Sequence, residues 1–143
     1  MSMIARADTQ VSELSGRCLC GAVSYRAGPP LYPATFCHCE SCRRAAAAQV
    51  VGWVTVAKHS ASFSAKPRYF ASSPGVERGF CGVCGSPLSY CNAQRPDELD
   101  FTICTLDNHG VVIPIDHIWM SDALPWDEPA DGLPQYQRTR GGA

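Results

Sequence analysis

Hydrophobic and polar side chains alternate along most of the chain from Gly16 onward, with the two-residue period of a half-buried β-strand. At residues 21–28, Val23 and Tyr25 alternate with small or polar residues, and the two prolines that follow interrupt the pattern. The same period, with β-branched and aromatic residues, predicts further short strands at 49–57, 61–65, 67–72, 76–80, 86–92, 99–106 and 113–121.

Helix is scarce, and the one helical pattern lies at residues 40–49, which are rich in alanine and other good helix formers. We therefore expect a mainly β fold with little helix. A length of 143 residues favours one compact domain. We expect a flexible N-terminal arm at 1–15, the β domain at 16–127, and a C-terminal loop and tail at 128–143, where proline and glycine are frequent.

The composition argues against several kinds of partner. The formal net charge is -1 and no basic stripe is present, so we expect no nucleic acid as a partner. No apolar run approaches the roughly 20 residues of a membrane-spanning helix, and we expect no membrane association. The first residues lack the apolar stretch of a secretory signal. Together these features predict a cytoplasmic protein.

Nine cysteines are many for a chain of this size. In a reducing compartment, cysteines that are clustered in sequence indicate a metal site more often than disulfides. Two of them, Cys91 and Cys104, stand apart, and we interpret both as small buried hydrophobic residues. The other seven form three close groups, Cys18-x-Cys20, Cys37-x-Cys39-x2-Cys42 and Cys81-x2-Cys84.

Two of these groups are pairs that are each followed by a glycine, Gly21 or Gly85. A glycine at this place lets the backbone turn and direct its N–H groups at the sulfur atoms. Two such pairs from distant parts of one domain favour a closed structural zinc site. The alternatives are redox dithiols or unrelated core cysteines. The predicted ligands are Cys18, Cys20, Cys81 and Cys84.

The third group, Cys37, Cys39 and Cys42, provides three ligands for a second metal ion. His38 most simply points away from that ion, and Cys91 is the other candidate for a fourth ligand. If neither binds, the fourth position is left for a ligand from outside the chain, as in catalytic zinc sites. A site rich in thiolates suits a soft ligand, and another thiol would be deprotonated there.

The order of the motifs resembles one known family. "GRCLCGAV", "CHCESCRR" and "FCGVCGSPL", followed by "HIWMSDALPWDEPADGLPQY", are similar to the glutathione-dependent formaldehyde-activating enzyme (GFA) family, which shares its domain with centromere protein V. The resemblance implies a β-tent of antiparallel sheets stabilised by zinc, with two zinc ions per chain. It also implies a carbon–sulfur lyase that joins glutathione, a small thiol, to formaldehyde.

Four further residues are candidates for substrate binding. Arg43 follows the third cysteine group and suits a carboxylate, as does Arg44; the alternative for either is a surface salt bridge. His117 and Trp119 share one face of the last predicted strand, and the resemblance implies that they line a pocket near the second zinc. A lone histidine there is also typical of a satisfied core residue.

Trp126 is expected to be a hydrophobic plug for the sheet. For the whole chain the sequence predicts a zinc-dependent carbon–sulfur lyase or synthase that acts on a small thiol adduct. A non-catalytic zinc-binding β-tent module is the alternative, and redox sensing through Cys37 and Cys42 is a weaker one.

Overall fold

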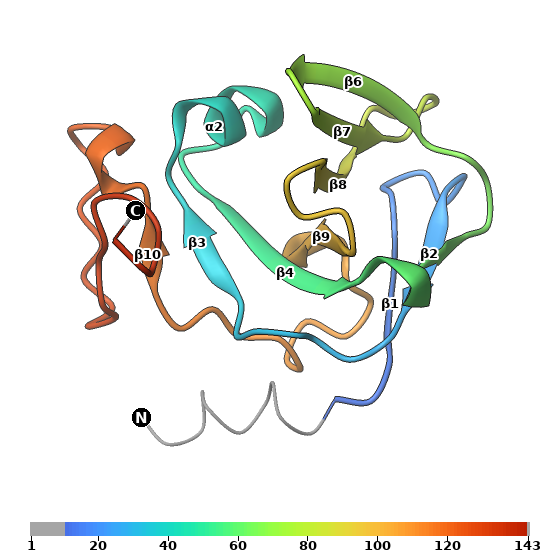
Figure 1. Cartoon of the computed structure of the whole chain (residues 1–143), viewed down its shortest axis with the longest axis horizontal. Coiled ribbons are helices and arrows are strands. Elements are labelled where there is room, and N and C mark those ends of the chain that lie inside the picture. The colour runs from blue at the N-terminus through green and yellow to red at the C-terminus, as the bar shows by residue number, and fades with distance from the viewer. Residues whose placement is uncertain (1–10, 143) are drawn as a thin grey trace.

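The computed structural model describes residues 11–142 (Figure 1). The fold is mainly β, as predicted, and the strands are short. The described part has one α-helix, α2 (Glu40–Ala46), and three 3-10 turns. The strands are β1 (Leu14–Arg17), β2 (Ser24–Ala27), β3 (Thr35–Cys37), β4 (Val51–Ala57), β5 (Ser62–Phe63), β6 (Arg68–Ser73), β7 (Val76–Phe80), β8 (Pro87–Asn92), β9 (Glu98–Thr102) and β10 (His117–Ile118).

The strands form two sheets. The smaller has the order β1-β2-β5, and the larger has the order β10-β3-β4-β9-β8-β7-β6. Neighbouring strands are antiparallel except for β10 and β3, which are parallel. Strands β6 to β9 follow one another as hairpins, which need only short connections. Figure 1 shows α2 and the β6–β7 hairpin at the top of the view, with β4, β8 and β9 below them.

The core lies between the two sheets. Tyr25 of β2 stacks on Phe101 of β9, with ring centroids 3.9 Å apart and planes 4° apart. Val54 and Val56 of β4 alternate inward and are fully buried, as is Leu88 of β8. Each such side chain stabilises the fold by about 1.5–3 kcal/mol through burial. The alternation seen in the sequence therefore marks the inward face of the strands.

Several predicted strands are shorter than their pattern indicated, β5 among them. The strand predicted at 99–106 ends at Thr102, because the Thr105 hydroxyl donates a hydrogen bond to the Thr102 carbonyl and the chain turns as a 3-10 helix. The strand predicted at 113–121 is reduced to β10. The sequence pattern also missed β1 and β3, which lie beside the cysteine motifs and are only 4 and 3 residues long.

The C-terminal segment packs against β10. Tyr136 donates its N–H to the His117 carbonyl at 2.8 Å, and His117 donates its own N–H to the Pro134 carbonyl. Arg140 forms an ion pair with Asp116, a carboxylate that is almost fully buried. These contacts hold residues 134–140 at the edge strand of the larger sheet. Within residues 11–142, no helix is long and apolar enough to cross a membrane.

Candidate active site

Four cysteines meet where the two sheets adjoin. Cys18 and Cys20 lie in the turn between β1 and β2, and Cys81 and Cys84 in the turn between β7 and β8. Their four sulfur atoms all lie within 4.8 Å of one another, and the Cys20 sulfur is 3.7 Å from that of Cys18 and 3.8 Å from that of Cys81. We call these residues the four-thiol cluster. The predicted grouping is confirmed, and a metal ion fits it.

The two glycines have the predicted role in these turns. Gly21 and Gly85 both have a φ of +81°, a left-handed conformation that strongly favours glycine. The turns direct backbone N–H groups at sulfur: Val23 donates to Cys18 at 3.3 Å, and Val83 donates to Cys81 at 3.3 Å. Such donors stabilise thiolates whether or not a metal ion is bound.

Three further cysteines meet at the start of α2. Cys37 ends β3, Cys39 caps the helix N-terminus, and Cys42 lies in its first turn. Their sulfur atoms lie within 4.8 Å of one another, and the Cys39 sulfur accepts a hydrogen bond from the Cys42 N–H at 3.3 Å. We call them the three-thiol cluster. It too has the geometry to hold a metal ion.

Neither candidate for a fourth ligand joins this cluster. The His38 ring points away: its Nε2 lies 2.9 Å from Nδ1 of His117, and its Nδ1 lies 3.4 Å from the Asp127 carboxylate. Cys91 lies on β8 and pairs with Glu77 of β7. Among residues 11–142, the metal-binding group at this place consists of three thiols. A tetrahedral ion held there would have one position for a ligand from outside the described chain.

A cavity of about 340 Å³ lies beside the three-thiol cluster, and Cys42 forms part of its wall. The cavity lies between α2, the inner strands of the larger sheet and the β6–β7 hairpin. It is lined by Cys42, Ala45, Ala46, Val51, Trp53, Phe70, Arg78, Gly79, Phe80, Gly85, Pro87, Ser89 and Thr102.

Arg78 of β7 lies in this wall, and sequence reasoning missed it. Its two terminal nitrogens are 3.6 and 3.7 Å from the Cys42 sulfur, and its Nε donates to the Ser72 hydroxyl at 3.1 Å. The guanidinium lies over the Tyr90 ring, 5.0 Å from its centroid. A signal was present in the sequence, because the strand period places Arg78 on the inward face of β7 between the hydrophobic residues at 76 and 80.

The three thiols do not ionise alike. Hydrogen bonds from Cys37 and Cys39 lower the pKa of Cys42, and the Arg78 guanidinium lowers it further. Hydrogen bonds with Cys39 and Cys42 raise the pKa of Cys37. Of the three thiols, the one that faces the cavity is therefore the one whose ionised form its surroundings favour.

None of the residues predicted to bind substrate lines the cavity. Arg43 donates its Nε to the His38 carbonyl at 3.2 Å, and Arg44 forms an exposed ion pair with Glu40 at 2.9 Å. His117 is buried between His38 and Asp131, whose carboxylate lies 2.7 Å from its Nε2.

Trp119 packs against the buried side chains of Cys37, Cys42 and Val51. Two other expectations are wrong. Trp126 is 69% exposed, because it lies in a turn of the loop that follows β10 rather than over the sheet. Cys104 is also exposed, because the chain leaves the sheet at Thr102.

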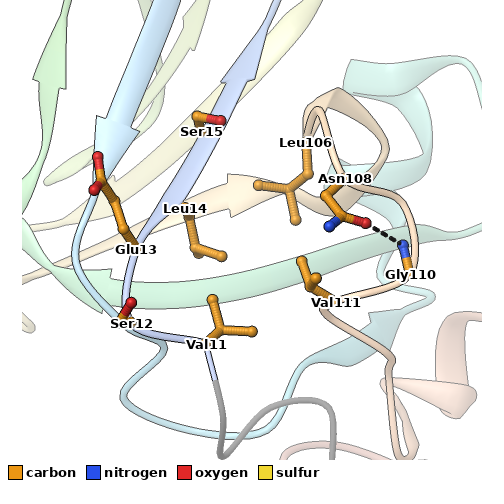
Figure 2. A pocket seen from close by; sticks show the side chains of 9 residues that line it. All are labelled: Val11, Ser12, Glu13, Leu14, Ser15, Leu106, Asn108, Gly110 and Val111. Carbon is orange, nitrogen blue, oxygen red and sulfur yellow. Dashed lines mark hydrogen bonds between the residues drawn. The ribbon is translucent and has the colours of Figure 1, made fainter.

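A second hollow of about 460 Å³ lies at the opposite side of the core, beside β1 (Figure 2). Figure 2 shows Val11, Leu14, Leu106 and Val111 directed toward it, while Asn108 accepts a hydrogen bond from the Gly110 N–H at 3.2 Å. No cysteine or cation is among its described lining residues. It therefore has none of the chemistry found beside Cys42, and we place the candidate active site in the smaller cavity.

Comparisons with known proteins identify a family and a similar fold. The family model described as glutathione-dependent formaldehyde-activating enzyme matches residues 13–122. An uncharacterized lyase of Schizosaccharomyces pombe is 34% identical over 86 residues, which are 59% of this chain and 63% of that protein. The chain therefore spans about 63% of that relative's length. A crystal structure of a Rhodobacter sphaeroides protein matches 66% of this chain and 88% of its own, with a TM-score of 0.56 and 21% identity, which is a likeness in fold.

Proposed function

Because the chain belongs to the glutathione-dependent formaldehyde-activating enzyme family, we propose that it is a zinc-dependent carbon–sulfur lyase that makes and breaks the bond between a small thiol and a carbonyl carbon. One observation carries this proposal. Cys42 belongs to the three-thiol cluster and also to the wall of the 340 Å³ cavity, so a molecule in the cavity reaches whatever the cluster holds. The relative named a lyase supports the reaction class.

Zinc suits the donors of both clusters. Thiolates are soft ligands, and four of them make the closed tetrahedron of a structural zinc site. We propose one zinc ion in each cluster, the first structural and the second at the reaction site. All nine cysteines are free thiols in the structure. This state is stable in a reducing compartment, and we propose the cytoplasm.

Zinc held by Cys37, Cys39 and Cys42 would lower the pKa of a thiol that enters the cavity and so supply a thiolate at neutral pH. Arg78 lies at the same end of the cavity and offsets part of the negative charge that gathers there. The apolar side chains of Trp53, Phe70 and Phe80 limit access of water to the reacting atoms.

The addition balances without an oxidant or a reductant. The sulfur lone pair forms the bond to the carbonyl carbon, and the π pair of the carbonyl moves to its oxygen. That oxygen gains one proton, and the thiol has lost one. The lyase direction is the reverse: the carbon–sulfur bond breaks, the carbonyl re-forms, and the sulfur takes up the proton.

We propose positioning roles for three residues that the sequence suggested as substrate ligands. Arg43 holds the His38 carbonyl and so fixes the backbone between Cys37 and Cys39. His117 holds the His38 ring on the side away from the cluster. Trp119 covers the same cluster from the loop after β10. Arg43 and His117 act on the cluster through His38, whereas Trp119 packs against the cluster itself.

The proposal is tested by the rate of adduct formation. Glutathione and formaldehyde, the pair in the family name, are the first substrates to try, with other small thiols and aldehydes after them. We expect exchange NMR to show faster formation of the adduct with the zinc-loaded protein than without protein. Cys42→Ser should return the rate to the uncatalysed value, whereas Cys104→Ser, at an exposed thiol outside both clusters, should not.

An uncatalysed rate for every thiol and aldehyde, with both metals bound, would refute the enzyme and favour a non-catalytic zinc-binding module. That result is meaningful only for folded protein. Metal content and the circular dichroism of the same samples therefore accompany each rate.

A further inference from the structure

The walls of the cavity beside Cys42 are mostly apolar. Val51 and Trp53 of β4, Phe80 of β7 and Ala45 and Ala46 of α2 supply most of its side-chain surface. Phe70 of β6 stands at its rim and is 62% exposed. An apolar molecule would gain from contact with this surface, at roughly 25 cal/mol for each Å² that leaves water.

Polar groups in the same wall are few. Arg78 is the one basic side chain among the described lining residues. The Thr102 hydroxyl already donates to the Pro87 carbonyl at 3.0 Å, and its neighbour in the wall, Ser89, is buried. No described lining residue carries a carboxylate, and the Cys42 sulfur is already paired with Arg78, so no unpaired anion in the wall would balance a positive group on a ligand.

Contacts with neighbouring side chains hold the Arg78 guanidinium in place. Its guanidinium and that of Arg95 both lie over the Tyr90 ring, with the two Cζ atoms 5.0 and 5.9 Å from the ring centroid. Arg95 in turn pairs with the buried Asp100 at 2.8 Å, and Asp100 accepts a hydrogen bond from the Thr55 hydroxyl at 2.6 Å. A cation fixed in this way attracts an anion without first losing much side-chain freedom.

Resting on the proposed function, we propose that the natural thiol has a compact apolar body and at most one negative charge. Its sulfur lies toward Cys42 and its charge toward Arg78. Glutathione fits this description poorly, because it carries two carboxylates and an ammonium group. Burying charges without partners is costly. The cavity offers a partner for one of the three.

The affinities of four thiols for the cobalt-substituted protein test this inference. Cobalt bound by thiolates absorbs visible and near-ultraviolet light, and an added sulfur ligand changes the spectrum, so binding is measured without turnover. The probes are benzyl mercaptan (neutral and apolar), 3-mercaptopropionate (one negative charge), cysteamine (positive) and glutathione. We expect the first two to bind at least about tenfold more tightly than glutathione, and cysteamine to bind most weakly.

Variants of Arg78 separate charge from shape. Arg78→Gln should weaken 3-mercaptopropionate by about tenfold and leave benzyl mercaptan within about threefold. Arg78→Lys should restore part of the loss, because it keeps the charge. The matched control is Arg44→Gln, which removes a cation from the exposed face of α2 and should change neither affinity.

The outcomes distinguish this inference from the proposed function. If glutathione binds most tightly, the inference is wrong and the proposed function stands. If no thiol alters the cobalt spectrum, the proposed function itself fails. If Arg78→Gln weakens all four thiols equally, the residue does not select for charge, and that part of the inference is overturned.

Discussion

The two cysteine clusters use the same donor atom but differ in reach along the chain. The four-thiol cluster joins the turn after β1 to the turn after β7, about 60 residues later, and so ties the smaller sheet to the larger one. The three-thiol cluster is drawn from residues 37–42, at the junction of β3 and α2. A metal ion in the first cluster would link distant parts of the chain, whereas one in the second would link only neighbouring residues.

The clusters differ also in what surrounds them. Turns containing left-handed glycines direct N–H donors at the sulfurs of the four-thiol cluster, which is typical of structural metal sites. The three-thiol cluster adjoins a cavity and a cation, Arg78. The comparison teaches that ligand count alone does not mark a reaction site. The missing fourth ligand points to a reaction site because the cluster also adjoins a cavity that a small molecule can enter.

The largest effect should follow Cys81→Ala, in the four-thiol cluster. A structural zinc site can contribute about 10–16 kcal/mol, as much as the whole folding free energy of a domain, about 5–15 kcal/mol. We expect the variant to be unfolded at 25 °C, with the near-ultraviolet circular dichroism lost. A folded Cys81→Ala protein with native dichroism would show that the two sheets do not depend on this metal.

Cys39→Ala, in the three-thiol cluster, should leave a folded protein. We expect the metal content to fall from two ions per chain to one, because two thiols hold an ion weakly. The free energy of unfolding should fall by about 1–2 kcal/mol, an ordinary value for a point substitution. Mass spectrometry under native conditions and urea denaturation measure the two quantities. Unfolding of this variant as complete as that of Cys81→Ala would abolish the contrast between the clusters.

Metal binding to the three-thiol cluster should release about two protons near neutral pH, because ligands bind as thiolates. The pKa of Cys37 is raised by its hydrogen bonds with Cys39 and Cys42. The pKa of Cys39 is raised as well: its bond with Cys37 lowers it, but its bond with Cys42 and burial outweigh that. The pKa of Cys42 is lowered, so we expect this thiol to contribute no proton.

It follows that the logarithm of the metal affinity rises with pH, with a slope of about 2 between pH 6 and 8. Competition with a chelator at each pH measures this slope in Cys81-intact protein whose four-thiol cluster is already filled. A slope near 3 would mean that all three thiols keep their protons, so that neither the hydrogen bonds from Cys37 and Cys39 nor Arg78 ionises Cys42 in this pH range.

His117→Phe should have a smaller effect. The substitution keeps a ring of similar size but removes the partner of the buried His38 Nε2, which costs about 1–3 kcal/mol in the free energy of unfolding. Urea denaturation measures it, with His109→Phe, at an exposed histidine, as the control expected within about 0.5 kcal/mol. Equal stability of the two variants would contradict the proposal that His117 holds the His38 ring in place beside the three-thiol cluster.

The sequence predicted the cysteine groups because the spacing within each group is local, whereas the meeting of the two pairs was inferred from the four ligands of a closed zinc site. Close cysteine spacings and the glycines after Cys20 and Cys84 encode turns that do not depend on the rest of the fold. The mainly β fold followed from the strand period for the same reason. Very short strands escaped detection, since β1 and β3 have too few residues to show a period.

The cavity was beyond the reach of local patterns. It forms where α2, the inner strands and the β6–β7 hairpin converge, and the contact of Arg78 with Cys42 joins residues 36 positions apart. The C-terminal segment shows the same limit. Its backbone bonds to β10 and its Arg140–Asp116 pair are tertiary contacts, and they also account for the burial of His117 away from the cavity.

A crystal structure of the zinc-loaded protein with a small thiol tests the central claim most directly. The account predicts zinc in both clusters, with the sulfur of the added thiol about 2.3 Å from the ion held by Cys37, Cys39 and Cys42. The body of the thiol should lie in the cavity beside Arg78. A fourth ligand supplied by the protein itself, from Cys91 or from another copy of the chain, would contradict the account.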